Sequence, residues 1–215
     1  MNPADPGPAD PAYAYADAAY AAYAAAVTQL VLHERQSRDR GRWDVMRACF
    51  APDSTVRVSW FRGTGADFVT ESQKMAERGD TATHRLSPPV VDVHGDRALA
   101  EVPAAIEVRT LLDGVEVDVT SRTRILYRAE RREGRWLIVS VDPVYESDTL
   151  ATSLPGTRLT VDAEELAAFR PPYRMLAHVL SRRGYRIGDD LYGDDRPQDS
   201  AALYASAVAW ARTRT

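Results

Sequence analysis

The spacing of hydrophobic positions changes several times along the chain, and each change predicts a different element. Residues 12–36 are rich in Ala and Tyr, and their larger side chains recur at helical spacing, which is typical of an amphipathic helix with one buried stripe. This stripe consists of Tyr20, Tyr23, Val27, Leu30 and Val31. Its tyrosines either pack in the core or line a ligand cavity. Gly41 is a helix stop signal and predicts that the helix ends just before it.

Two further helices and a strand are predicted next. A short helix covers residues 43–50 and is closed by Pro52, and residues 54–60 alternate between apolar and polar side chains as in a strand. A third helix covers residues 64–79. Its inward-facing residues are Phe68, Val69 and Met75.

Residues 83–146 have the pattern of long strands joined by tight turns. The turn sequences are HGD at 94–96, LDG at 112–114 and REG at 132–134. Three helices followed by a mostly antiparallel sheet predict an α+β fold, with the helices packed over one concave face.

The composition divides the chain into three parts. Residues 1–11 are rich in Pro, Ala and Asp, which predicts disorder. Residues 12–150 form the predicted domain. Residues 151–215 are expected to be a helical extension packed on that domain, because they are too short and too polar to form a domain of their own. This extension would wrap the sheet edge, cover a pocket or build a dimer interface.

Charge and cysteine content exclude several classes of function. The net charge of −4 gives no electrostatic case for nucleic acid or an anionic membrane as partner. The single cysteine, Cys49, rules out an internal disulfide framework and is expected to fill the core. No segment is apolar and long enough to span a bilayer, and the first residues do not resemble a signal peptide. A cytoplasmic location is therefore expected.

The strand at residues 117–127 has a polar centre on its apolar face. Ser121 and Thr123 lie there between apolar neighbours, while Arg122 and Arg124 lie on the opposite face. Buried hydroxyl groups need partners, so Ser121 and Thr123 either bond to the backbone or point into a pocket. The residues alone do not decide between these alternatives.

Asp39 and His84 each have a structural and a chemical interpretation. Taken singly, Asp39 is explained as a turn residue that bonds to local backbone, and His84 as a partly buried histidine with a backbone partner. Together they form a candidate acid–base pair. Burial in an apolar cavity would raise the pKa of Asp39, and a charged histidine beside it would offset that shift. No set of histidines and carboxylates has the spacing of metal ligands.

The order of these motifs resembles a known family. "DRGRWD" follows the long helix, "FAPD" ends the second one, and "TH" precedes hairpins that end in "GRWLI". This pattern, over roughly residues 20–148, resembles the SnoaL-like branch of the NTF2-like superfamily and within it the scytalone dehydratase-like group. The resemblance implies a cone-shaped, curved antiparallel sheet, an α+β barrel with helices over its concave face and one deep pocket.

The resemblance also implies roles for individual residues. Asp39, four residues before Trp43, and His84 stand where the relatives carry an acid–base pair. Ser121 and Thr123 stand near the positions of two substrate-binding polar residues.

The chain departs from the pattern of the relatives at several positions. Two tyrosines that hold substrate or water in the relatives correspond to Arg38 and Val58 here, and a second histidine corresponds to Val108. Trp60 is expected to shape the pocket wall, and Tyr23 and Val58 are further candidates for contact with substrate.

Acid–base chemistry on a small apolar polyketide- or terpenoid-like molecule is the resulting hypothesis. Asp39 and His84 would catalyse dehydration or isomerisation, and neither reaction needs a metal or organic cofactor. One alternative is a SnoaL-like cyclase or an epoxide hydrolase, and the hydrolase requires an arginine inside the cone. The other is a non-catalytic ligand-binding or structural module. The relatives commonly form homodimers through the outer sheet face, which predicts the same here.

Overall fold

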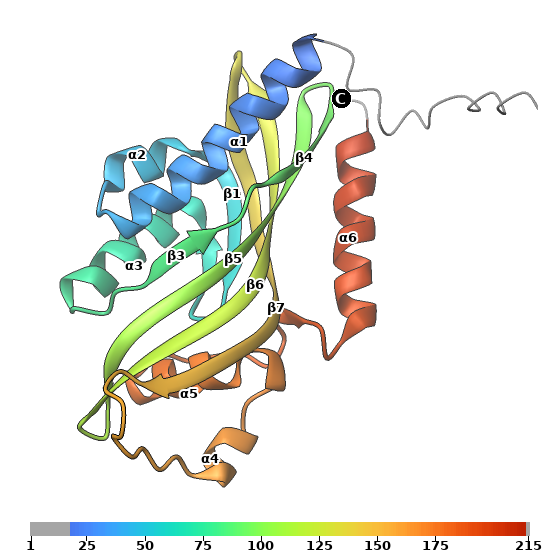
Figure 1. The fold of residues 1–215 in the computed structure, drawn as a ribbon. Coiled ribbons are helices and arrows are strands. Elements are labelled where there is room, and N and C mark those ends of the chain that lie inside the picture. Colours follow the sequence, from blue (N-terminus) through green and yellow to red (C-terminus); the bar gives the residue numbers. More distant parts are fainter. Residues whose placement is uncertain (1–17, 214–215) are drawn as a thin grey trace, which may run out of the picture.

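A curved, open sheet forms the centre of the molecule (Figure 1). The computed structural model describes residues 18–213, so the predicted disorder at residues 1–11 lies outside the described part. Within that part the sheet has eight strands in the order β2-β1-β7-β6-β5-β3, with β4 paired to β5 and β8 to β7. The strands are β1 (Phe50–Val58), β2 (Phe61–Thr64), β3 (Thr83–Leu86), β4 (Val90–His94), β5 (Arg97–Leu112), β6 (Val115–Arg132), β7 (Arg135–Thr152) and β8 (Tyr192–Gly193).

Three helices cover one face of the sheet, which confirms the predicted α+β architecture (Figure 1). They are α1 (Ala18–Asp39), α2 (Trp43–Ala48) and α3 (Gly65–Glu77). The stripe on α1 packs into the core through Val27 and Val31, which are almost fully buried. Phe68, Val69 and Met75 on α3 are buried as predicted, and so is Cys49.

The long hairpins end at the predicted turns. Asp113 and Gly114 both have positive φ angles, 48° and 81°, and they join β5 to β6 between the paired residues Leu112 and Val115. A two-residue turn with two positive φ angles matches the twist of an antiparallel pair, and glycine adopts this backbone without strain. This turn therefore sets the register in which β5 and β6 pair.

The segment around Pro52 differs from its prediction. Pro52 lies within β1 instead of closing a helix, and α2 ends at Ala48. The pairing of β1 with β7 is irregular between Phe50 and Thr55. Proline is tolerated there because an irregular stretch requires no ladder hydrogen bond from its nitrogen. The predicted strand also ends early, so that Trp60 lies in the turn before β2.

The face of β6 that was predicted to point inward is the buried face in the structure. Its buried residues are Val117, Val119, Ser121, Thr123, Ile125 and Tyr127. Arg122 and Arg124 are exposed on the other face, where Arg124 forms ion pairs with Glu101 and Glu146.

The C-terminal segment packs on both sides of the sheet. It contains α4 (Ala163–Ala167), the 3-10 helix η2 (Pro171–Tyr173), α5 (Arg174–Arg182) and α6 (Pro197–Arg212). Helix α5 lies across the lower end of the concave side, whereas α6 runs along the convex side (Figure 1). Residues Leu203, Ala207 and Ala211 of α6 pack on Leu99, Leu126 and Val144. Helix α6 thus covers part of the outer face, so a dimer formed through that face would have to accommodate it.

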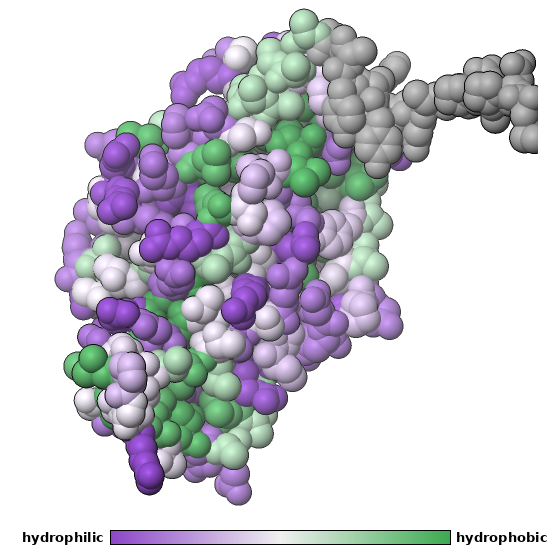
Figure 2. All heavy atoms as spheres, in the orientation of Figure 1, coloured by the Kyte–Doolittle hydropathy of each residue, from purple (hydrophilic) through white to green (hydrophobic). Residues whose placement is uncertain are grey.

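The surface on the side shown in Figure 2 is mostly hydrophilic. Apolar residues gather at its lower end, where Figure 1 places the β5–β6 turn and α5. None of the helices between residues 18 and 213 is both long and apolar enough to cross a lipid bilayer.

The docking of α6 on the sheet leads to a stability prediction. Leu203→Ala should lower the free energy of unfolding by about 2–5 kcal/mol, because it leaves a cavity between α6 and β5–β7. Val208→Ala on the same helix should change it by less than about 1 kcal/mol, because Val208 is 37% exposed. Urea unfolding of both variants measures the difference. Equal effects of the two substitutions would contradict the packing of α6 on the sheet.

Candidate active site

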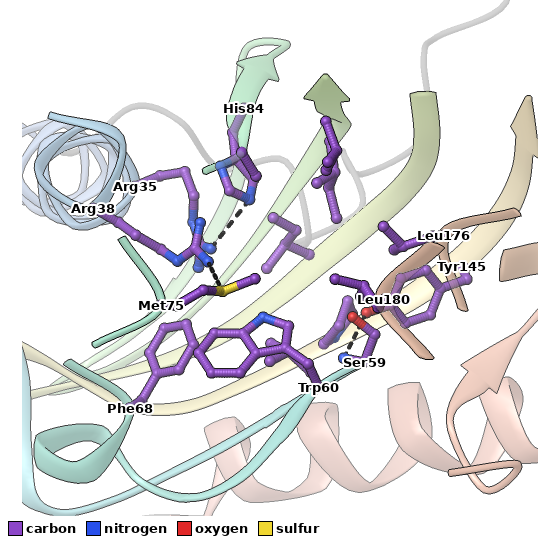
Figure 3. A pocket seen from close by; sticks show the side chains of 16 residues that line it. Arg35, Arg38, Ser59, Trp60, Phe68, Met75, His84, Tyr145, Leu176 and Leu180 are labelled. Carbon is purple, nitrogen blue, oxygen red and sulfur yellow. Dashed lines mark hydrogen bonds between the residues drawn. The ribbon is translucent and has the colours of Figure 1, made fainter. Parts of the chain in front are cut away.

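A largely apolar pocket lies between the concave face of the sheet and helices α1, α3 and α5. The space between its atoms totals about 540 Å³, most of which is narrow or belongs to the open mouth. Figure 3 shows side chains from these elements pointing into it. The apolar lining residues are Val58, Trp60, Phe68, Met75, Ala82, Ile106, Val108, Ile125, Pro143, Leu176 and Leu180, and the polar ones are Arg35, Arg38, Ser59, His84 and Tyr145.

Asp39 and His84 meet at the side of this pocket. Asp39 is the last residue of α1, and His84 lies on the edge strand β3. The His84 ring nitrogen Nδ1 lies 2.6 Å from Asp39 Oδ1, and the His84 backbone N–H donates to Asp39 Oδ2 at 2.6 Å. The His84 side chain is 4% exposed, and the Asp39 side chain is 10% exposed. The carboxylate thus fixes the ring by two bonds, and His84 lines the pocket whereas Asp39 does not.

The second ring nitrogen of His84 faces an arginine. Arg35 Nη1 lies 3.4 Å from His84 Nε2, and Figure 3 shows the two side chains pointing toward each other. A guanidinium group carries only donors, so Nε2 is the acceptor and the ring proton lies on Nδ1, toward Asp39. This network assigns His84 as a neutral imidazole whose Nε2 lone pair accepts from Arg35 at the pocket wall.

The protonation state of His84 differs from the expected one. Burial and the nearby charges of Arg35 and Arg38 lower the pKa of His84 to about 3, although Asp39 opposes the shift. Burial disfavours the charged form of Asp39, but hydrogen bonds from His84 and the charge of Arg35 outweigh it and lower the pKa of Asp39. The expected opposition between burial and His84 at Asp39 is present, whereas the expected charged histidine is wrong. The pair consists of a carboxylate and a neutral imidazole.

A buried network that the sequence analysis missed holds Arg35. Arg35 is 3% exposed and lies 2.9 Å from Glu34 Oε2. Tyr127, on β6, donates to the same oxygen at 3.2 Å and accepts from Arg35 at 3.4 Å. A signal was present in the sequence, because Glu34, Arg35 and Arg38 continue the helical spacing of the buried stripe from Val31.

Arg38 also points into the pocket (Figure 3). Its Nη2 donates to Met75 Sδ at 3.7 Å. Its guanidinium carbon lies 5.7 Å from the Trp60 ring centre and 5.9 Å from that of Phe68. Burial and the charge of Arg35 lower the pKa of Arg38 to about 10, so the side chain stays cationic at neutral pH.

The structure separates the candidate substrate-binding residues into two groups. Trp60 and Val58 line the pocket, but Tyr23, Ser121 and Thr123 are not among its lining residues. Thr123 Oγ1 donates to the Val144 carbonyl at 2.8 Å, which satisfies the hydroxyl without a ligand. Ser121 is fully buried, and its hydroxyl has no hydrogen-bond partner within residues 18–213.

Tyr23 is too far along α1 to reach this pocket. It lies 12 residues before Arg35, the nearest residue of α1 that lines the pocket, a distance of about 18 Å along an α-helix. Its ring packs edge-on against Trp136, with ring centres 5.7 Å apart, and the Arg131 guanidinium lies 4.7 Å above it. The packing interpretation of Tyr23 therefore fits the structure, whereas the cavity-lining one does not. In the described part of the chain, no three His, Cys, Asp or Glu side chains gather as metal ligands.

Comparison with known proteins agrees with this architecture. The model of the SnoaL-like domain family matches residues 19–142. The chain belongs to the SnoaL-like family. A PEP2-like protein of Fusarium vanettenii is 31% identical to this SnoaL-like protein, over 80% of this chain and 78% of its own length.

Two solved structures share the fold. A candidate scytalone dehydratase from Novosphingobium aromaticivorans has a TM-score of 0.52 and 14% identity, over 65% of this chain and 97% of its own. A hexachlorocyclohexane dehydrochlorinase from Novosphingobium barchaimii has a TM-score of 0.54 and 14% identity, over 66% of this chain and 97% of its own. At this identity the likeness concerns the fold alone.

The low pKa of His84 predicts how the stability of this SnoaL-like domain depends on pH. The unfolded chain binds a proton at His84 near pH 6.5, whereas the folded chain does so only at much lower pH. The free energy of unfolding should therefore fall as the pH drops from about 7 to about 5, by up to about 1 kcal/mol per pH unit from this group. Urea unfolding across this range should give a shallower slope for His84→Gln than for the wild type. Parallel slopes would contradict a neutral His84.

Proposed function

We propose that this protein is a cofactor-independent acid–base enzyme, a dehydratase or isomerase that acts on a small, largely apolar polyketide- or terpenoid-like molecule. The observation that carries the proposal is the 2.6 Å contact between Asp39 Oδ1 and His84 Nδ1. It leaves Nε2, to which Arg35 donates at 3.4 Å, as the ring nitrogen that can accept a proton. A neutral imidazole positioned by a carboxylate is a common general base.

The proton transfers follow from this geometry. His84 Nε2 would take a proton from a carbon next to a substrate carbonyl, and the electron pair of that C–H bond would form a double bond. In dehydration the neighbouring C–O bond breaks, and the leaving hydroxide takes the proton back from Nε2 as water. In isomerisation the proton returns to another carbon. Because the pKa of His84 is low, its protonated form is a strong acid and returns the proton readily.

Other residues would hold the substrate in place. Asp39 acts through His84, since it does not line the pocket, and is a positioning residue in this scheme. Trp60 and Val58 form part of the apolar wall. Arg35, next to Nε2, would stabilise the negative charge that develops on the substrate oxygen as the proton leaves carbon.

The two related folds support an elimination reaction. Their names describe a dehydratase and a dehydrochlorinase, and each reaction named in this way removes a small molecule and leaves a double bond. The likeness is weak support, and the arrangement of Asp39 and His84 carries the proposal.

The alternatives receive less support from the site. For the epoxide hydrolase, Arg122 and Arg124 were the candidate arginines, and both are exposed on the outer face. Arg35 and Arg38 do lie inside, but Arg35 contacts Glu34 and His84, and no aspartate lines the pocket. For the non-catalytic module, a solvent-facing Asp39 was expected, whereas Asp39 is 10% exposed and binds His84.

Proton exchange tests the proposed chemistry without knowledge of the natural substrate. The protein should speed hydrogen–deuterium exchange next to the carbonyl of small cyclic hydroxyketones in D2O, as followed by proton NMR. His84→Gln should slow this exchange by about 10²–10⁴-fold, the range typical of losing a general base. The matched control is His94→Gln, because His94 is exposed at the end of β4, and it should exchange like the wild type. Equal exchange by the wild type and His84→Gln would exclude His84 as the base.

A further inference from the structure

Arg38 is a partly buried cation whose contacts are all with neutral groups. Its Nε is fully buried and has no hydrogen-bond partner among residues 18–213. Nη2 contacts only a thioether sulfur, that of Met75, which is a weak acceptor. The aromatic rings of Trp60 and Phe68 lie next to the guanidinium. A cation in such surroundings is poorly compensated, because buried charges are normally paired.

The acidic groups nearest to it on α1 bind other partners. Both oxygens of Asp39 accept hydrogen bonds from His84, and Oε2 of Glu34 binds Arg35 and Tyr127. No ion pair of Arg38 with a carboxylate occurs in the described part of the chain. Arg35 therefore has an internal counter-charge, and Arg38 has none in direct contact.

The pocket itself has a one-sided charge. Two arginines line it, and no aspartate or glutamate does. Both guanidinium carbons lie 5.9 Å from the centre of the Phe68 ring, so the two cations gather at one end of the cavity (Figure 3). Leu176, Leu180 and Ile106 line other parts of the wall. A ligand that matches this lining has an apolar body and one anionic group.

We propose that Arg38 binds a carboxylate group of the substrate, so that the natural substrate is a small carboxylic acid with an apolar ring system. A planar carboxylate matches a guanidinium edge through two parallel hydrogen bonds. A phosphate would call for more donors, and the remaining walls are too apolar to solvate it. This inference deepens the proposed function, because it names the substrate class of the same pocket.

Binding of a carboxylate would also affect the base. The charges of Arg35 and Arg38 both disfavour protonation of His84. An anion bound to Arg38 cancels part of that repulsion and raises the proton affinity of Nε2. The substrate would thereby strengthen the base that acts on it, and a neutral analogue of the same shape would not.

A matched pair of ligands tests the proposal. Isothermal titration calorimetry should show 2-naphthoate binding to the wild type about tenfold or more tightly than the neutral 2-naphthamide, which has the same shape. The neutral phenol 2-naphthol separates recognition of a carboxylate from recognition of a hydroxyl group, and inorganic phosphate tests for a general anion site. Both should bind more weakly than 2-naphthoate.

Variants assign the preference to Arg38. Arg38→Met should bind 2-naphthoate and 2-naphthamide equally, and it should fold, because the replaced cation has no ion-pair partner in the described part of the chain. Arg38→Gln provides a second uncharged side chain. Arg122→Met removes an exposed arginine from the outer face of the sheet and should keep the full preference.

Several outcomes would overturn the proposal. They are equal affinities of the wild type for 2-naphthoate and 2-naphthamide, no binding of either, tighter binding of phosphate or 2-naphthol, or an unchanged preference in Arg38→Met. Unfolding of both Arg38 variants would show that Arg38 is structural and would also overturn it.

The binding and exchange experiments separate the two proposals. If the wild type prefers 2-naphthoate but exchanges no carbon-bound protons, the carboxylate-binding site is supported and the acid–base function is rejected. If the wild type exchanges the protons of neutral ketones but does not prefer 2-naphthoate, the acid–base function is supported and the carboxylate-binding site is rejected.

Discussion

The contact between the end of α1 and the edge strand β3 is the constraint on which the site depends. Asp39 bonds to both the ring and the backbone of His84, so a single carboxylate joins two segments that lie 45 residues apart. The backbone bond fixes the strand, and the ring bond fixes the tautomer. Because both bonds come from the last residue of a helix packed in the core, the direction of Nε2 is set by the fold rather than by a flexible loop.

The burial of charge then decides the chemistry. Four ionisable side chains of α1, those of Glu34, Arg35, Arg38 and Asp39, gather at one end of an apolar cavity beside His84. Water is scarce there, so neighbouring charges act strongly on one another. The two arginines keep His84 neutral, and Asp39 orients it without protonating it. The same cations that lower the pKa of His84 would stabilise an anionic substrate or intermediate.

The sequence predicted what depends on local patterns. The alternation of apolar and polar residues identified the inner face of β6, and the LDG turn located the β5–β6 hairpin. The resemblance to the SnoaL-like family indicated that Asp39 and His84 form a pair. Glu34 and Arg35 were missed because charged residues on a helix are normally exposed to solvent. Their burial depends on Tyr127, a partner about ninety residues later in the chain, which the local sequence does not indicate. Tyr23 was misplaced as a pocket candidate because periodicity shows which face of a helix is buried and not what lies opposite each turn.

The C-terminal segment adds a second layer of specificity to a shared fold. The family match ends at residue 142, yet Leu176 and Leu180 of α5 line the pocket beyond it. Tyr185, which follows α5, donates to Asp80 Oδ2 at 2.7 Å and packs against Trp60. This contact ties the segment to the pocket wall. The family core thus supplies Asp39 and His84, and the extension supplies part of the apolar wall. The pocket is therefore completed by a part of the chain outside the family match, and any ligand that fills it would contact α5 as well as the family core.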